Sequence, residues 1–101
     1  MAKKSQIERN DKRKRLAKKF ATRRAKLKVM AKDKDLSPED RFNARIKLAA
    51  LPRNSSPSRF RLRCELTGRS RGNYRKFRLC RMKIRELGSS GQIPGLIKSS
   101  W

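Results

Sequence analysis

Apolar residues are sparse in the first thirty positions, and those present recur at the spacing of a helix. The segment 2–31 contains no Pro or Gly and is dominated by Lys, Arg, Ala and Leu, which are good helix formers. Its apolar positions form a narrow stripe with a period of about 3.6 residues. They are Leu16, Phe20, Leu27 and Met30. The pattern predicts a basic helix that either frays in free solution or lies along phosphates in an assembly.

A second helix is predicted to begin after Ser37. Ser37 is a good capping residue, Pro38 suits the first helical position, and Asp40 follows three residues after the cap. The helix should end near Ala50, because Pro52 disfavours a helical conformation in the residue before it. The apolar positions of one face are Phe42, Ile46, Ala49 and Ala50. We expect the two helices to form a hairpin, with this face in its core.

Residues 52–62 read as an extended polar segment rich in proline and serine. Such stretches are often flexible linkers. The alternative is a segment that threads between RNA helices, because Arg53 and Arg59 bracket the serines, and guanidinium and hydroxyl groups both donate to phosphate.

A short helix is predicted from Leu79 to Leu87, with Gly88 ending it. A glycine- and proline-containing turn over residues 91–95 then leads to an apolar and basic tail. The last residue, Trp101, either packs on the preceding segment or contacts a base or a neighbouring protein.

Composition changes this picture, because the chain has little material for a core. Of 101 residues, only 35% are hydrophobic, and the formal net charge is +23. A compact fold of this size is marginal from its surface-to-volume ratio alone, and self-repulsion weakens it further. We expect a chain that is partly disordered alone and ordered by a polyanion.

The positive charge lies in two arms. Residues 1–30 carry thirteen Lys and Arg against two acids, residues 31–51 five against four, and residues 52–101 thirteen against two. The first arm is rich in lysine and the second in arginine. Because the arginine fork grips phosphate at two points and stacks on bases, the second arm is the better candidate for shaped recognition.

The two cysteines stand in the frame of a four-cysteine zinc site that lacks half of its thiols. Cys64 precedes Thr67 by three positions and Cys80 precedes Lys83 by three, with twelve residues between the pairs. Structural zinc needs four Cys or His ligands, and the chain has no His. We therefore expect no metal, and two buried, reduced cysteines that pack as small apolar residues. Glycine turns between them suggest a knuckle without zinc.

Several classes of protein fit poorly. Without His and with only eight acids, the chain offers no catalytic triad or carboxylate pair, so an enzyme is not expected. No stretch approaches the ~20 apolar residues of a membrane span. The N-terminus lacks the apolar run of a secretory signal. Its basic composition with few acids is compatible with an organellar transit peptide. Two widely spaced cysteines favour a reducing compartment.

Five segments make the sequence resemble a known family. They are LPRNSSPSR at 51–59, RCELTGR at 63–69, YRKF at 74–77, LCRMKIREL at 79–87 and PGLIKSSW at 94–101. Over essentially its full length, the chain resembles the universal small-subunit ribosomal protein fourteen family, in its long bacterial and organellar form. That form lacks zinc and carries a helical insert, which agrees with Thr67 and Lys83 at two cysteine positions of the short form.

The resemblance implies a structural constituent of the small ribosomal subunit. Family members bind the 3′ major domain of the small-subunit rRNA. They lie beside the small-subunit proteins numbered three, ten and nineteen, and they help order the head near the decoding region during translation. The location would be the cytoplasmic ribosome, with a mitochondrial or plastid ribosome also possible.

The residues themselves indicate how RNA would be bound. Lys and Arg neutralise phosphates and release counterions, while arginine and aromatic side chains stack on exposed bases. The predicted RNA contacts are Arg53, Arg59, Arg61, Arg63, Arg69, Arg71, Arg75, Lys76, Arg81 and Lys98, with Tyr74 and Phe77 as stacking residues.

The predicted fold is mainly α, extended and irregular, in three parts. Residues 1–51 form a basic helical extension and hairpin, residues 52–62 an extended RNA-threading segment, and residues 63–101 a zinc-free knuckle module with a C-terminal tail. We expect no cofactor, no membrane association and no homo-oligomer.

Two rival interpretations stay open. A nucleic-acid-binding regulator with a degenerate zinc finger would need a recognition helix and usually a dimer seam, and neither is visible. A cationic membrane-active peptide or chromatin-like packer would use the first helix but would leave the structured second half without a role.

Overall fold

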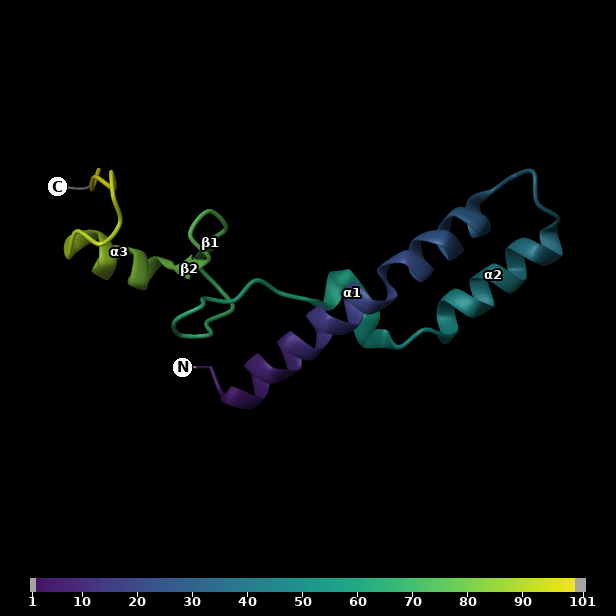
Figure 1. Ribbon diagram of the computed structural model, residues 1–101, viewed down its shortest axis with the longest axis horizontal. Coiled ribbons are helices and arrows are strands. Elements are labelled where there is room, and N and C mark those ends of the chain that lie inside the picture. The colour runs from purple at the N-terminus through teal and green to yellow at the C-terminus, as the bar shows by residue number, and fades with distance from the viewer. Residues whose placement is uncertain (1, 100–101) are drawn as a thin grey trace. The chain divides into compact units, whose positions relative to one another are not determined.

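The computed structural model describes residues 2–99, and its elements are mainly helical (Figure 1). The chain divides into two compact units. One contains residues 9–60, and the other combines residues 61–99 with residues 2–8. The prediction of a mainly α chain is confirmed. Trp101, for which packing or stacking was expected, lies outside the described residues.

Helix α1 runs from Lys4 to Lys32, in agreement with the predicted basic helix. Along the predicted stripe, Leu16, Phe20 and Leu27 are half-buried, whereas Met30 is exposed. The one fully buried residue of α1 is the polar Asn10. The helix therefore buries little apolar surface, as expected of a chain with so few apolar residues.

Helix α2, Pro38–Ala50, begins at the predicted cap. The Ser37 hydroxyl accepts a hydrogen bond from the Asp40 backbone N–H and donates one to the Asp40 carboxylate. This exchange satisfies an N–H that the helix itself cannot pair. Figure 1 shows the chain turning back after α1 into α2, and both helices belong to the same compact unit apart from the first residues of α1.

The prediction that the apolar face of α2 forms the core of the hairpin is wrong. Phe42 is 61% exposed and Ile46 is 52% exposed, whereas Ala44 is 2% exposed. The covered side consists of Ala44 with the half-buried Arg41 and Leu48. The physical reason is that a small alanine lets the rest of the unit come close to the helix, and the stems of longer residues close the flanks.

The segment predicted to be extended contains two short 3-10 helices, Arg53–Ser55 and Pro57–Arg59. Pro57 opens the second of them, where its fixed φ suits the first helical position and its missing N–H is not needed. The Ser55 backbone N–H and hydroxyl both donate to the Pro52 carbonyl. Ser55 is almost fully buried and accepts a 2.7 Å hydrogen bond from Arg24 of α1. These contacts hold the serine-rich segment against its own unit.

The second unit contains a two-stranded antiparallel sheet and a short helix. Strand β1, Asn73–Tyr74, pairs with β2, Leu79–Cys80, so that Asn73 faces Cys80 and Tyr74 faces Leu79. Helix α3 follows directly as Arg81–Ser89. It therefore begins two residues later than predicted, because Leu79 and Cys80 are engaged in the sheet.

Gly88 does not end α3 as expected. The helix continues to Ser89 and closes with a Schellman motif, in which Gln92 N–H donates to the Leu87 carbonyl and Gly91 N–H to the Gly88 carbonyl. Gly91 supplies the positive φ, +75°, that this ending requires. Among residues 2–99, the helices are too short or too polar to cross a membrane.

The two sides of α2 predict different responses to added volume. Ala44→Leu should lower the free energy of unfolding by about 1–3 kcal/mol, because the larger side chain has no space on the covered side. Ala49→Leu on the exposed side should change it by about 0.5 kcal/mol or less. Urea unfolding followed by circular dichroism measures both, and equal losses would contradict the assignment of the covered side.

Candidate nucleic-acid interface

A loop around the two cysteines forms the frame of the second unit. The Cys64 backbone N–H donates to the Arg69 carbonyl at 2.9 Å, and Gly68 N–H donates to the Cys64 carbonyl at 2.8 Å. Gly68 has φ +75°, and a Cβ there would stand 2.6 Å from the side chain of Ile7. The loop therefore needs glycine at this position, both for its turn and for contact with the first turn of α1.

Both cysteines are free and buried, with exposed fractions of 3% for Cys64 and 0% for Cys80. This confirms that both cysteines are reduced and buried, as predicted, although the hydrogen-bond donors around the Cys64 sulfur mean that Cys64 does not pack as an apolar residue. Thr67 occupies the position at which the spacing of a four-cysteine zinc site would require another thiol. Its hydroxyl lies 3.8 Å from the Cys80 sulfur. Within residues 2–99, no three Cys, His, Asp or Glu side chains are grouped closely enough to hold a metal ion.

The Cys64 thiol lies among hydrogen-bond donors. Burial raises its pKa, but hydrogen bonds from the Thr67 hydroxyl and from the backbone of Cys80, Thr67 and Leu66 outweigh burial and lower the pKa to about 6. The thiol is thus ionised at neutral pH. Lys83, on the first turn of α3, donates a 2.8 Å hydrogen bond to Glu86, which raises the pKa of Lys83.

Three of the predicted RNA-binding arginines hold the loop in shape. Arg61 donates from Nε to the Ser70 carbonyl, Arg63 from Nη1 to the Gly68 carbonyl, and Arg69 from Nε to the Arg71 carbonyl, at 2.9, 2.9 and 3.1 Å. A guanidinium has several N–H donors, so a carbonyl contact does not exclude phosphate binding. These arginines therefore shape the surface that RNA would meet.

Other predicted contacts project from this frame. Arg71, Arg75 and Lys76 are exposed, and Phe77 is half-buried with the Lys76 ammonium 5.6 Å from its ring centre. Arg75 and Lys76 lie in the four-residue loop that joins β1 to β2. The loop thus presents cations on a short, hydrogen-bonded support.

The same loop contains a cation that the sequence did not single out. Arg78 is a non-glycine residue with positive φ, +54°, a conformation that is unfavourable for most side chains. Its backbone N–H donates to the Tyr74 carbonyl at 2.8 Å, and its guanidinium lies 3.9 Å from the exposed Glu65 carboxylate. Nothing in the local sequence pattern separates Arg78 from the basic residues around it.

A hollow of about 280 Å³ brings together residues that are distant in the sequence. Tyr74 of β1, Arg81 of α3 and Lys98 of the tail all line it, and all three were predicted RNA contacts. Arg85 lines it as well and was missed, although its position one helical turn after Arg81 is a usable signal. Tyr74 is 56% exposed, so its ring can stack on an RNA base while the three cations beside it bind phosphates of the neighbouring nucleotides.

A second hollow of the same unit has a volume of about 450 Å³. Arg63, Arg69 and Lys83 line it together with Ser70 and Thr67. The Nε of Arg63 is buried and has no hydrogen-bond partner among residues 2–99. Glu86 lines this hollow as well, and its carboxylate is paired with Lys83 at 2.8 Å. The net positive charge that a phosphate group would meet here therefore comes from Arg63 and Arg69.

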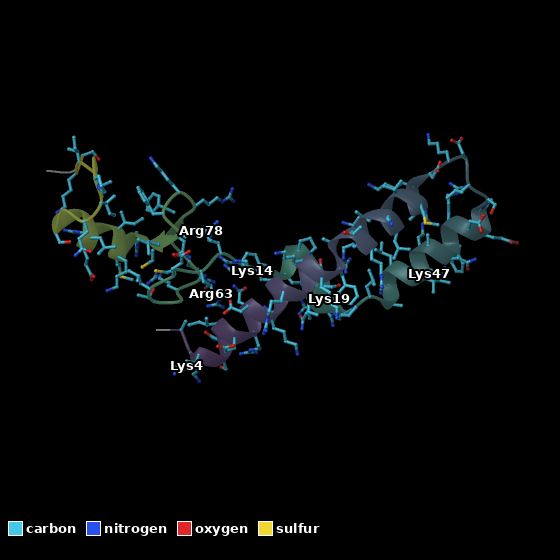
Figure 2. All side chains as sticks on the ribbon, viewed as in Figure 1. Lys4, Lys14, Lys19, Lys47, Arg63 and Arg78 are labelled. Carbon is cyan, nitrogen blue, oxygen red and sulfur yellow. The ribbon has the colours of Figure 1, made fainter. Side chains whose placement is uncertain are left out.

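The first unit has its own basic surface. Arg53 and Arg59 line a shallow hollow of about 320 Å³ together with Arg24. The ammonium of Lys14 lies 5.8 Å from the ring centre of Phe60. Figure 2 shows nitrogen-tipped side chains along both units, including the labelled Lys14, Lys19, Arg63 and Arg78.

Comparison with known proteins assigns the chain to a family. Residues 47–100, from the end of α2 through the cysteine loop and α3, match the family described as ribosomal protein S14p/S29e. The chain belongs to this family. This confirms the resemblance seen in the sequence motifs.

Relatives match over the whole length. The small ribosomal subunit protein uS14 of Paramagnetospirillum magneticum is 67% identical over 101 residues, covering all of both chains. The proteins of the same name from Hyphomonas neptunium and Acidiphilium cryptum are 60% and 59% identical, again over all of both chains. The similarity thus includes α1 and α2, which lie largely outside the family match.

The ionised Cys64 predicts a spectroscopic signature. Because its pKa falls from an ordinary 9.0 to about 6 on folding, the thiolate stabilises the fold fully above pH 9, and this contribution declines as the pH falls toward 6. An ultraviolet titration of thiolate absorbance should show a step with a midpoint near pH 6. The step should be absent in Cys64→Ser and should move toward pH 9 in denaturant; a step that Cys64→Ser leaves in place would contradict the assignment.

Proposed function

We propose that this chain is a structural constituent of the small ribosomal subunit that binds small-subunit rRNA. The observation that carries the proposal is the full-length identity of 67% with a small ribosomal subunit protein. The geometry supports it, because the cysteine-loop unit presents several cations and an exposed tyrosine on a frame fixed by its own hydrogen bonds.

The mechanism divides into anchoring and shaped recognition. The lysines of α1 neutralise phosphates without reading sequence, and each phosphate contact releases counterions. The second unit recognises RNA shape: Tyr74 stacks on an exposed base, and Arg81, Arg85 and Lys98 bind phosphates beside it. Because the chain has a net charge of +23, its two units are ordered most fully when RNA neutralises them.

The family resemblance supports a finer placement. We propose that the RNA target is the 3′ major domain, in the head of the subunit near the decoding region. On this proposal, the neighbours are the small-subunit proteins numbered three, ten and nineteen. The chain contributes no catalytic step; it orders RNA during assembly and translation.

Sedimentation tests the proposed function. A tagged chain should co-migrate with the small ribosomal subunit on a gradient. It should remain bound through a high-salt wash, because stacking and shape contacts, which salt does not screen, hold the chain in addition to the phosphate contacts. A chain found in light fractions, or on DNA, would contradict the proposal. A basic protein that is only loosely attached would leave the particle in the same wash.

Two double substitutions that remove the same charge test where the RNA contacts lie. Replacing Arg71 and Arg81 with Gln should weaken binding to an rRNA fragment more than replacing Lys3 and Lys4 with Gln, although each pair removes the same charge. If roughly ten phosphates are contacted, the log–log salt slope of the unmodified chain should be near −7 to −9. The arginine pair should reduce its magnitude by about 1–2. Equal losses for the two pairs would show that the charge acts diffusely.

Tyr74→Leu separates stacking from charge. We expect a loss of about 1–3 kcal/mol of binding free energy with an unchanged salt slope, because a stacked ring carries no charge. Equilibrium binding at several salt concentrations measures both quantities, and a changed slope would argue against stacking. Phe42→Leu, at an exposed aromatic outside the cysteine-loop unit, is the matched control.

A further inference from the structure

Helix α2 carries an apolar stripe that the rest of its own unit, residues 9–60, leaves uncovered. Phe42 is 61% exposed, Ile46 is 52% exposed, and Ala49 is exposed as well. Their spacing of four and three residues places them on one face of the helix. The covered side of α2 is a different face, marked by Ala44 at 2% exposure.

The stripe is unusual for this chain. Isolated exposed apolar residues are common on protein surfaces, but here two large ones are aligned on one short helix. The chain has only four Phe and 35% hydrophobic residues, and the buried apolar residues among those described are Ala44, Cys64, Cys80 and Ile84. Phe42 and Ile46 are larger than Ala44 or either cysteine, yet they remain in water. Covering them in an assembly would be favourable.

Charge around the stripe argues against RNA as the covering partner. Half of the eight acidic residues of the chain lie within residues 33–40, and residues 31–51 have nearly balanced charge between two strongly basic arms. Glu39 is aligned with Phe42 and Ile46 at helical spacing, and Asp35 and Glu39 are exposed. Among the described residues, the ion pairs involve Glu65 and Glu86, so the carboxylates at this end of α2 have no cation of their own. They would repel phosphate.

A second copy of the chain fits the stripe no better. Each chain carries a net charge of +23, so pairing two of them would add repulsion to any apolar gain. The stripe fits a different protein, one whose apolar surface is rimmed by Lys or Arg where it meets the carboxylates.

We propose that the exposed face of α2 is a protein-docking surface. Phe42 and Ile46 enter an apolar groove on another protein of the same particle, and Asp35 and Glu39 meet basic residues at the groove's rim. The inference rests on the proposed function, since it places the partner in the small subunit. The two basic arms then bind RNA, and the nearly neutral helix between them binds protein.

A photo-reactive residue tests the contact in the assembled particle. Benzoylphenylalanine replaces Phe42 in one tagged chain and Lys47, exposed but off the stripe, in a control chain. Small subunits are purified through a high-salt gradient and irradiated, and the products are mapped by mass spectrometry. The position-42 probe should join a protein of the subunit through a peptide in which apolar residues adjoin Lys or Arg, several-fold more strongly than the position-47 probe.

Other outcomes of this experiment overturn the inference. Cross-links from position 42 to rRNA or to a second copy of the chain would show a different occupant. Yields equal to those of the control would show that the stripe stays uncovered. If the tagged chains do not enter the particle at all, the proposed function fails instead, so the two failures are distinguishable.

A paired substitution gives an independent measurement. Phe42→Ser with Ile46→Ser should leave rRNA-fragment binding by the isolated chain unchanged, because neither residue lies in a basic hollow or in the core. In cells that also make the unmodified chain, the variant should occupy several-fold fewer small subunits. Val29→Ser, at a 69% exposed apolar residue of α1, is the control and should compete normally. Normal competition by the paired variant would contradict a docking role.

Discussion

Mutual repulsion among like charges limits every part of this structure. With thirty-one Lys and Arg against eight acids, the chain cannot gather into one large core, and its fully buried residues are few and small. Stability comes instead from short-range hydrogen bonds that place cations against backbone carbonyls, as Arg61, Arg63 and Arg69 do in the cysteine loop. The same groups that hold the loop also make it attractive to phosphate. Folding and RNA binding thus draw on one set of side chains.

The cysteine loop is held together by hydrogen bonds of the chain itself. Backbone N–H groups and the Thr67 hydroxyl surround the Cys64 sulfur, which is the environment that stabilises a thiolate. In a zinc site the metal would supply the positive charge. Here Lys83 and the surrounding arginines lie on the same small unit, and Lys83 is held by Glu86 at 2.8 Å. The turn geometry is maintained by the chain's own hydrogen bonds.

Sequence reasoning succeeded where local rules decide the structure. The absence of Pro and Gly correctly predicted helix α1, and the Ser37 cap correctly predicted where α2 begins. The burial of both cysteines was also expected. It failed where tertiary contacts decide: periodicity located an apolar face on α2 at Phe42 and Ile46, but it could not show that Ala44 would be covered instead. The hollow shared by Tyr74, Arg81, Arg85 and Lys98 likewise depends on how the tail returns to α3, and the strained backbone of Arg78 has no signature in composition.

The contact between Ile7 and Gly68 links the beginning of the chain to a loop that is synthesised much later. A nascent chain therefore emerges with its first helical turn lacking a packing partner, and that partner appears only after some sixty further residues have been made. The second unit, in turn, cannot be completed from its own contiguous sequence, because residues 2–8 belong to it. Alterations within residues 2–8 thus act on a unit whose other residues, 61–99, are synthesised much later.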